Sequence, residues 1–352
     1  MINTFQILKR RRWPMPPING KLKLRDIARL TGHTVGTVSK ALHDKPGLAP
    51  QTREHILKVA RESGYIGNAL AGSLRSGTTK TAAIILGDIA NPLFAIMAKG
   101  LIAALEKVGY SAILLNSEEN SEEEVRAVTT ALSRNVDGVF LCPTQRGMEG
   151  IELLRRNGAP CVLIGRYFAD SPLDSVVFDD FYGGRLAAEH LLNLGHRNVL
   201  FLAGPDCVSS ARERREGFMA AMRDAGVQSD PALIREVGIT ADASESIAEA
   251  LSGERRFSAV CAFSDYVAWQ VLYALSARGV RVPEDVSVIG FDDIQSDIHM
   301  PVPLTTIGCD KRALGEQAVE LLMRRIAEPE APVSQIRLET KLVARGTTRG
   351  LA

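Results

Sequence analysis

The chain has 352 residues, which exceeds the length at which a single hydrophobic core usually stops growing, so two or three domains are expected. Hydrophobic residues make up 45% and charged residues 24%, which excludes wholesale disorder, and no apolar run approaches the roughly 18 residues of a membrane helix. The net charge of +1 hides a division: residues 1–77 hold 14 Lys and Arg against 4 Asp and Glu (+10), and the remainder holds 28 against 37 (−9). A basic segment of that size is typical of a nucleic-acid binder.

The N-terminal residues 1–20 carry a basic run, Lys9–Arg12, but lack the apolar stretch of a secretory signal, so a cytoplasmic location is expected. Either they form a disordered arm that binds phosphate, or translation begins further along, at Met15. The 5 cysteines are odd in number, widely spaced and free of C-x-x-C pairs, which predicts reduced thiols and neither disulfides nor a zinc site.

The basic segment has the pattern of three short helices. Apolar spacing predicts a helix from Leu24 to Leu30, a turn at Gly32, and a second helix for which the hydroxyl of Thr34 is placed as N-cap. A third helix is expected to begin at Thr52 or its neighbours and to end at Gly64. Together they predict a helix-turn-helix domain.

The second helix is expected to turn mostly small side chains outward, which would let it lie deep in a major groove. These outward residues are Val35, Gly36, Thr37, Ser39 and Lys40.

After Thr79, strand-like apolar runs alternate with amphipathic helical stretches, a pattern that favours an α/β fold with two successive parallel sheets. The expected strands are Thr81–Leu86, Ala112–Leu115, Gly138–Leu141, Cys161–Ile164, Asn198–Leu202, Ala259–Phe263 and Val286–Phe291. The expected helices are Glu122–Leu132, Arg214–Asp224, Val267–Leu275 and one through Leu101 and Leu105.

Ligands of open parallel sheets bind at the carboxyl ends of the strands. The loops there contain Asp88 with Asn91, Arg166, Ser209–Arg214, Ser264 with Asp265, and Asp292 with Asp293. Converging carboxylates and guanidinium groups suit a polar, hydroxyl-rich ligand.

The sequence contains no G-x-G-x-x-G, P-loop, H-E-x-x-H or G-x-S-x-G motif, so we expect no catalytic residue, no metal and no cofactor. Among the histidines only His299, near the Asp292 loop, is placed for catalysis, and a surface position suits it better. The alternative function is an α/β sugar-binding protein or enzyme that has no DNA target and uses the basic segment for oligomerisation.

Several segments resemble the LacI-GalR family of transcriptional regulators, over nearly the whole chain from Lys21. They include Leu24-Arg-Asp-Ile-Ala-Arg-Leu-Thr-Gly, Gly36-Thr-Val-Ser-Lys-Ala-Leu, Gly64-Tyr-Ile-Gly-Asn and Val282-Pro-Glu-Asp-Val-Ser-Val-Ile-Gly-Phe-Asp-Asp. The resemblance implies a three-helix headpiece plus hinge helix, followed by a two-lobed, periplasmic-binding-protein-like core of parallel sheets. The implied boundaries are an extension at 1–20, headpiece 21–67, hinge 68–78 and core 79–346, with lobe 1 at about 79–179 and 311–338 and lobe 2 at about 180–310 and 339–346.

The resemblance also implies the DNA contacts. Val35, Gly36 and Lys40 would read bases, with Lys40 standing where arginine is usual, and Leu74 of the hinge helix would wedge into the minor groove. His33 and Lys23 depart from the family pattern and are expected to loosen the headpiece. The implied DNA-binding residues are Thr34, Val35, Gly36, Thr37, Ser39, Lys40, His43, Thr52, Tyr65, Asn68, Ala71 and Leu74.

For the effector, the resemblance assigns Arg214 and Asp292 first, and then Asp88, Phe94, Arg166 and Ser264. Ser264 stands where the family frequently has asparagine, and Gly165 stands where it frequently has aspartate. These departures leave the ligand class open between a sugar, a sugar acid and a phosphorylated ligand. The implied protein is a homodimeric repressor of a near-palindromic double-stranded DNA site, with an effector that either releases DNA or promotes its binding. An ion pair that merely pins loops is the alternative role of Arg214 and Asp292.

Overall fold

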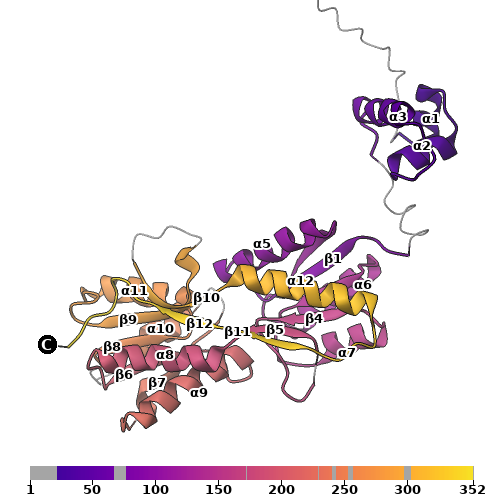
Figure 1. The fold of residues 1–352 in the computed structure, drawn as a ribbon. Coiled ribbons are helices and arrows are strands. Elements are labelled where there is room, and N and C mark those ends of the chain that lie inside the picture. Colours follow the sequence, from indigo (N-terminus) through magenta and orange to yellow (C-terminus); the bar gives the residue numbers. More distant parts are fainter. Residues whose placement is uncertain are drawn as a thin grey trace, which may run out of the picture. The chain divides into compact units, whose positions relative to one another are not determined.

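The computed structural model describes residues 22–66, 77–171, 173–228, 230–239, 243–252, 257–296 and 303–351. The chain divides into two compact units, Met1–Gly77 and Thr78–Ala352, each of which is considered by itself (Figure 1). The expected extension at 1–20 and the expected hinge residues Asn68, Ala71 and Leu74 lie outside the described residues.

Residues 22–66 of the first unit form three helices, α1 (Leu24–Thr31), α2 (Val35–Leu42) and α3 (Pro50–Glu62). Their apolar faces meet in a small core in which Ile27, Val38 and Ile56 are fully buried. Gly32 ends α1 with φ 69°, in the left-handed region that glycine adopts without strain. The three predicted helices are therefore confirmed.

The helix ends match the prediction in part. The Thr34 hydroxyl accepts a hydrogen bond from the Thr37 amide at 3.2 Å, so the expected cap of α2 is present. Helix α3, expected to begin at Thr52 or its neighbours, begins two residues before Thr52, at Pro50, whose fixed φ suits a first turn. Lys23 is the N-cap residue of α1, and its amide donates to the Asp26 carboxylate at 2.9 Å.

The second unit consists of two lobes, each built on one six-stranded sheet (Figure 1). The sheet of lobe 1 is entirely parallel, and that of lobe 2 is parallel except for β12, which runs antiparallel to β10. In sheet order, lobe 1 has β11 (Gln335–Leu338), β5 (Ser175–Phe178), β4 (Cys161–Ile164), β3 (Gly138–Leu141), β1 (Thr81–Leu86) and β2 (Ser111–Asn116). Lobe 2 has β12 (Thr340–Val343), β10 (Thr305–Cys309), β9 (Ser287–Asp292), β8 (Ala259–Ala262), β6 (Val199–Ala203) and β7 (Ile234–Glu236).

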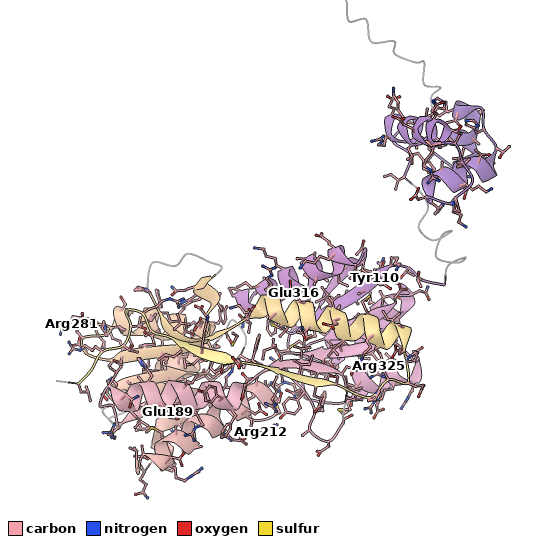
Figure 2. All side chains as sticks on the ribbon, viewed as in Figure 1. Tyr110, Glu189, Arg212, Arg281, Glu316 and Arg325 are labelled. Carbon is pink, nitrogen blue, oxygen red and sulfur yellow. The ribbon has the colours of Figure 1, made fainter. Side chains whose placement is uncertain are left out.

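Helices pack against both sheets. Those of lobe 1 are α5 (Pro92–Lys107), α6 (Ser121–Ser133), α7 (Glu149–Arg156) and α12 (Lys311–Ala327). Those of lobe 2 are α8 (Asp180–Asn193), α9 (Ser209–Asp224), α10 (Ser244–Ala250) and α11 (Asp265–Ala277), with short 3-10 turns at Pro231–Leu233 and Ile294–Ser296. Arg325, labelled in Figure 2, lies near the end of α12. It pairs at 2.8 Å with the buried Asp174 and fixes that helix to lobe 1.

The chain passes between the lobes three times: from β5 to α8, from β10 to α12, and from β11 to β12. Figure 1 shows the last crossing as one continuous ribbon in the C-terminal colours. The helix expected over Arg214–Asp224 is present but begins earlier, at Ser209, so the residues from Ser209 that were expected in a loop form the first turns of α9. Arg214 is thus held by a helix.

Candidate functional site

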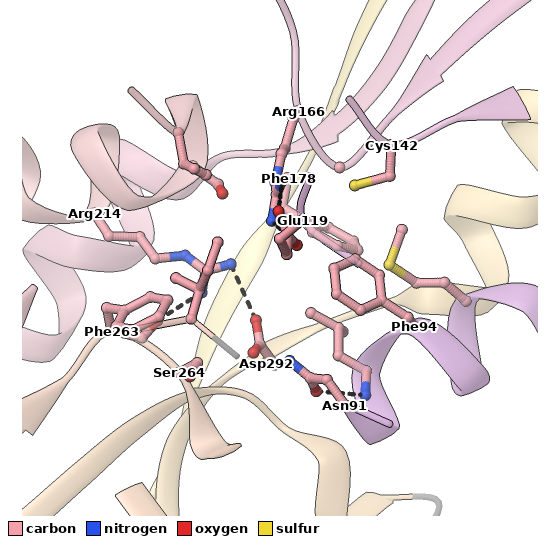
Figure 3. A pocket seen from close by; sticks show the side chains of 16 residues that line it. Asn91, Phe94, Glu119, Cys142, Arg166, Phe178, Arg214, Phe263, Ser264 and Asp292 are labelled. Carbon is pink, nitrogen blue, oxygen red and sulfur yellow. Dashed lines mark hydrogen bonds and ion pairs between the residues drawn. The ribbon is translucent and has the colours of Figure 1, made fainter. Parts of the chain in front are cut away.

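A pocket lies between the two lobes, at the carboxyl ends of strands from both sheets, and encloses about 590 Å³ when the part open to solvent is counted. Figure 3 shows side chains from both lobes converging on it. Lobe 1 contributes Asn91, Leu93, Phe94, Met97, Glu119, Cys142, Gly165, Arg166 and Phe178, and lobe 2 contributes Val208, Ser210, Arg214, Ile239, Phe263, Ser264 and Asp292.

Arg214 reaches the pocket from α9, and its buried guanidinium has partners on three sides (Figure 3). Nε donates to Asp180 Oδ1 at 2.7 Å, Nη1 donates to the Phe263 carbonyl at 2.6 Å, and Nη2 lies 3.0 Å from Asp292 Oδ1. The group also lies 3.6 Å from the centre of the Phe291 ring. Arg214 therefore joins the start of α8 to the ends of β8 and β9.

Asp292 is the last residue of β9 and its side chain is fully buried. Its φ of 107° lies in the region that favours glycine, so the backbone is strained at the pocket. Burial raises the pKa of this carboxyl group, and the charges of Arg214 and Lys311 lower it. Apart from the Arg214 ion pair, its oxygens receive no hydrogen bond from any described residue, which leaves an acceptor facing the pocket.

Arg166 follows β4 and is paired with Glu119 in a buried, bidentate arrangement (Figure 3). Nη1 donates to Glu119 Oε2 at 2.8 Å and Nη2 donates to Oε1 at 2.7 Å, while Nη1 also donates to the Pro143 carbonyl at 2.9 Å. Gly87 is required opposite this pair, because a Cβ there would lie 2.1 Å from Glu119 Oε1. The positive charge of Arg166 is thus matched before any ligand enters.

The remaining wall is largely apolar. Phe94 and Met97 project from α5, and Phe178 and Phe263 lie at the ends of β5 and β8. Ser264 lines the pocket as well, but its hydroxyl caps α11 by accepting from the Val267 amide at 3.3 Å.

Beside the pocket, a set of polar contacts joins the lobes directly. The Ser209 amide donates to Gln145 Oε1 at 2.7 Å, and the Tyr167 amide donates to the Ser209 hydroxyl at 3.2 Å. Glu213 of α9 accepts from the Tyr167 hydroxyl and pairs with Arg337 of β11 at 2.9 Å. These contacts hold the lobes together around the pocket.

The outward face of α2 in the first unit is open to solvent. Val35, which is 46% exposed, lies there with the exposed Thr34, Gly36 and Lys40, and His43 follows at the end of the helix. Thr37, Ser39, Thr52 and Tyr65 are half-buried. His33 packs edge-on against His55 with ring centres 6.3 Å apart.

Within the described ranges, no group of three or more His, Cys, Asp or Glu side chains is arranged to hold a metal ion. All five cysteines are free, and burial raises the pKa of Cys142, at the pocket, to about 12. Over the same part of the chain, no helix combines the length and the apolar character needed to cross a membrane.

Family models match both parts of the chain: residues 23–68 match "Bacterial regulatory proteins, lacI family" and residues 188–348 match "Periplasmic binding protein-like domain". The HTH-type transcriptional repressor PurR of Aliivibrio fischeri (strain MJ11) is 30% identical over 328 residues, which cover 92% of this chain and 97% of the relative. The chain belongs to the lacI family. The expected fold class, a helix-turn-helix headpiece followed by a periplasmic-binding-protein-like core, is thereby confirmed.

Two solved structures of transcriptional regulators are similar to this chain over most of its length. The structure of the lac repressor dimer bound to operator and the anti-inducer ONPF has a TM-score of 0.81 at 25% identity, and covers 94% of this chain and 100% of its own. A complex of the transcriptional regulator CelR with cellobiose has a TM-score of 0.71 at 29% identity, and covers 93% and 100%.

Five of the six residues that the family pattern assigned to the effector line the pocket: Phe94, Arg166, Arg214, Ser264 and Asp292. Asp88 does not line it, because its carboxylate accepts from the Ala90 amide at 2.9 Å and closes the turn before α5. The ion pair weighed as an alternative for Arg214 and Asp292 is present, so both residues serve the fold as well as the pocket.

Sequence reasoning missed several residues of this lacI-family pocket or its supports, among them Glu119, Asp180, Lys311 and Cys142. Glu119 sits in the acidic run Ser117-Glu-Glu-Asn120, which looks like a solvated loop. The carboxylate turns inward only because Arg166, 47 positions away, meets it. No local signal in the sequence identifies such a pair.

Proposed function

We propose that this lacI-family protein is a sequence-specific DNA-binding repressor, active as a homodimer, and that a small effector bound between its lobes sets its affinity for DNA. The observation that carries the proposal is the buried Asp292 carboxylate with acceptor capacity left over in an interlobe pocket, on a chain that also holds a basic helix-turn-helix unit. The printed names of the relatives, a repressor and regulators solved with operator DNA or cellobiose, support it.

The charges of the pocket favour a neutral, hydroxyl-rich effector over a sugar acid or a phosphorylated ligand. Arg166 is neutralised by Glu119, and Arg214 faces both Asp180 and Asp292. An anionic ligand would have to compete with these buried carboxylates. A neutral sugar can instead donate a hydroxyl hydrogen to Asp292 while its ring carbons stack against Phe94. The effector class we propose is therefore a neutral sugar.

The DNA-binding half of the proposal is tested by gel shifts of the full chain on the region upstream of its own gene, over a salt series. We expect specific binding, with the logarithm of the binding constant falling linearly with the logarithm of the salt concentration. Lys40→Ala should abolish the preference for this region over random DNA, since Lys40 is exposed on the outward face of α2. Lys58→Ala, an exposed lysine on α3, is the control and should keep the preference. A wild type that cannot distinguish the two DNAs contradicts the proposal.

The effector half is tested by thermal shift with neutral sugars, including cellobiose and ribose, against glucuronate, gluconate and sugar phosphates. We expect neutral sugars to stabilise the wild type and not Asp292→Asn, which removes the ionised acceptor. Stabilisation by the acids alone would contradict a neutral effector. Sugar binding that is the same with and without DNA would favour the alternative, a sugar-binding protein or enzyme without a DNA target.

A further inference from the structure

The turn that carries Asp292 is held in an unusual conformation. Asp292 and Asp293 have φ values of 107° and 51°, so two successive residues other than glycine lie in regions that L-amino acids seldom adopt. Such a turn persists only where its surroundings fix it. The direction of the Asp292 carboxylate therefore depends on whatever holds the two peptide groups.

Lys311 contacts this turn directly. Its ammonium donates to the carbonyl of Asp292 at 2.7 Å and to that of Asp293 at 2.9 Å, and the residue is 4% exposed. Both acceptors belong to the left-handed turn itself. The two carbonyl dipoles and the Asp292 charge stabilise an ammonium group buried in this way. That stabilisation is lost if the turn relaxes.

Lobe 2 also contributes contacts to the turn. Asp265 accepts from the Ile294 amide at 2.9 Å and from the Thr306 hydroxyl at 2.6 Å, and Arg345 pairs with the Asp293 carboxylate at 2.6 Å. Lys311, in contrast, is the first residue of α12, which packs in lobe 1. The turn thus receives support from both lobes.

Helix α12 is tied closely to the lobe 1 wall of the pocket. A Cβ on Gly100 of α5 would lie 2.8 Å from the Lys311 carbonyl, and a Cβ on Gly315 of α12 would lie 2.6 Å from the backbone of Gly100. The two helices therefore meet backbone to backbone, and α5 carries Phe94 and Met97 into the pocket. A shift of the Lys311 backbone would therefore displace α5 as well.

We propose that Lys311 is a positioning residue for the effector: it holds the Asp292–Asp293 turn so that the Asp292 carboxylate faces the pocket, and it links that turn in lobe 2 to the α12–α5 pair in lobe 1. The link to effector binding rests on the proposed function, whereas the link to the turn does not. Lys311 itself does not line the pocket, so it acts through Asp292.

The first test compares crystal structures of the effector-free full chain for the wild type, Lys311→Met and Lys107→Met. Methionine keeps the stem and removes the ammonium, and Lys107 is an exposed lysine of α5 paired with Glu316 of α12. We expect the Asp292–Asp293 turn to relax to negative φ only in Lys311→Met, with the Asp292 carboxylate turned from the pocket. An unchanged turn overturns the proposal.

If Lys311→Met does not fold, a second variant, Lys311→Arg, decides the question. It should fold and keep the turn, because a guanidinium can also donate to two carbonyls. Loss of the turn in Lys311→Arg would equally contradict the role.

The second test is a double-mutant cycle for cellobiose and ribose binding by calorimetry. Lys311→Met should weaken binding at least about tenfold in the wild type and have little further effect in Asp292→Asn, because the lysine acts through that carboxylate. Equal losses in both backgrounds overturn the positioning role. If neither sugar binds the wild type, the proposed effector class fails, and the turn in the crystal structures still decides the role of Lys311.

Discussion

The side chains of Arg166 and Glu119 are 8% and 3% exposed, so two opposite charges are removed from water together at the pocket. Each is stabilised mainly by the other. Such a pair adds little stability compared with two apolar side chains of similar volume. If one partner is lost, however, the other remains as an unpaired buried charge. It fixes the loops after β2 and β4 relative to each other.

Replacement of one partner is therefore expected to be far more harmful than replacement of both. Arg166→Met should lower the free energy of unfolding of the core by about 3–5 kcal/mol, because Glu119 is left as an unpaired buried carboxylate. Arg166→Met combined with Glu119→Gln should recover most of this loss, as measured by urea unfolding. A double variant as unstable as the single one would show that the cause is lost packing.

At this scale the sequence predicted some pocket residues and missed others for a physical reason. Arg214 and Asp292 were predicted because they occupy fixed places in long motifs. Asp88 was also expected in the pocket, but an aspartate two residues before a backbone amide can satisfy that amide, and here it does. The partner of Arg166 depends on tertiary contact across 47 positions, which single-sequence patterns do not contain.

At the scale of elements, the delivery of Arg214 depends on how closely α9 packs against α8. A Cβ on Gly217 of α9 would lie 1.9 Å from the Phe181 carbonyl, and a Cβ on Gly184 of α8 would lie 2.1 Å from the Arg214 carbonyl. The glycines are needed because the helices touch backbone to backbone. Helix α9 can therefore hold Arg214 against Asp180 at 2.7 Å.

Gly217→Ala should push α9 outward, destabilise the core by about 1–3 kcal/mol and weaken sugar binding, because overpacking is relieved only by a backbone shift. The matched variant is Gly36→Ala in α2, where the nearest atom to the new Cβ would be Thr34 Oγ1 at 3.8 Å. That change should raise the melting temperature of the headpiece, since alanine is the better helix former. Urea and thermal unfolding measure the stability of each unit in each variant. Equal destabilisation by Gly217→Ala and Gly36→Ala would contradict the role of close helix packing.

The C-terminal segment after β12 is held by a buried histidine. His196 contacts the hydroxyl groups of Ser258 and Ser287 at 2.8 and 3.1 Å, and its Nε2 lies 3.1 Å from the Arg349 carbonyl. Burial lowers the pKa of His196 below its ordinary value of 6.5, although the Arg349 carbonyl opposes the shift. The neutral imidazole is thus the form that the fold accommodates.

Acid is therefore expected to destabilise the core through this residue. As pH falls through 6.5, His196 in the unfolded chain takes up a proton before the folded one does, so the free energy of unfolding decreases. The slope is at most about 1.4 kcal/mol per pH unit for one group. The difference in urea stability between the wild type and His196→Gln, measured from pH 5 to 8, should shrink towards the acid end; a difference independent of pH would exclude this role.

The strands predicted from apolar runs match β1, β3 and β4 residue for residue, because a strand buried on both faces has a continuous hydrophobic sequence. The edge strands β11 and β12 were not singled out as strands. β11 alternates between exposed and half-buried residues and β12 shows no regular alternation, and each spans only four positions, which is too short for a period to be recognised. Their place follows from the tertiary fold alone.

For the whole molecule, the near-neutral net charge results from two opposite parts, +10 over residues 1–77 and −9 over the rest. Phosphate attracts the first and repels the second. The acidic core therefore keeps its surface from binding nucleic acid at random and leaves DNA contact to the basic part.

A fragment of residues 78–352 should accordingly show no DNA binding from about 50 to 200 mM salt, while the affinity of the full chain falls by orders of magnitude over that range. Gel shifts at each salt concentration measure both. The fragment should melt at the same temperature as the core within the full chain, because the two units are separately compact. DNA binding by the fragment would contradict this division of charge.

The three chain crossings have a consequence for synthesis. The headpiece helices are complete by Glu62, but the sheet of lobe 1 lacks its edge strand until Leu338 and that of lobe 2 until Val343. At translation rates of about 5–20 residues per second, the headpiece leaves the ribosome on the order of tens of seconds before either sheet can close. A nascent chain thus carries a folded headpiece well before its two lobes are complete. A single premature stop shortly before Gln335 would remove the edge strands β11 and β12 and so damage both lobes at once.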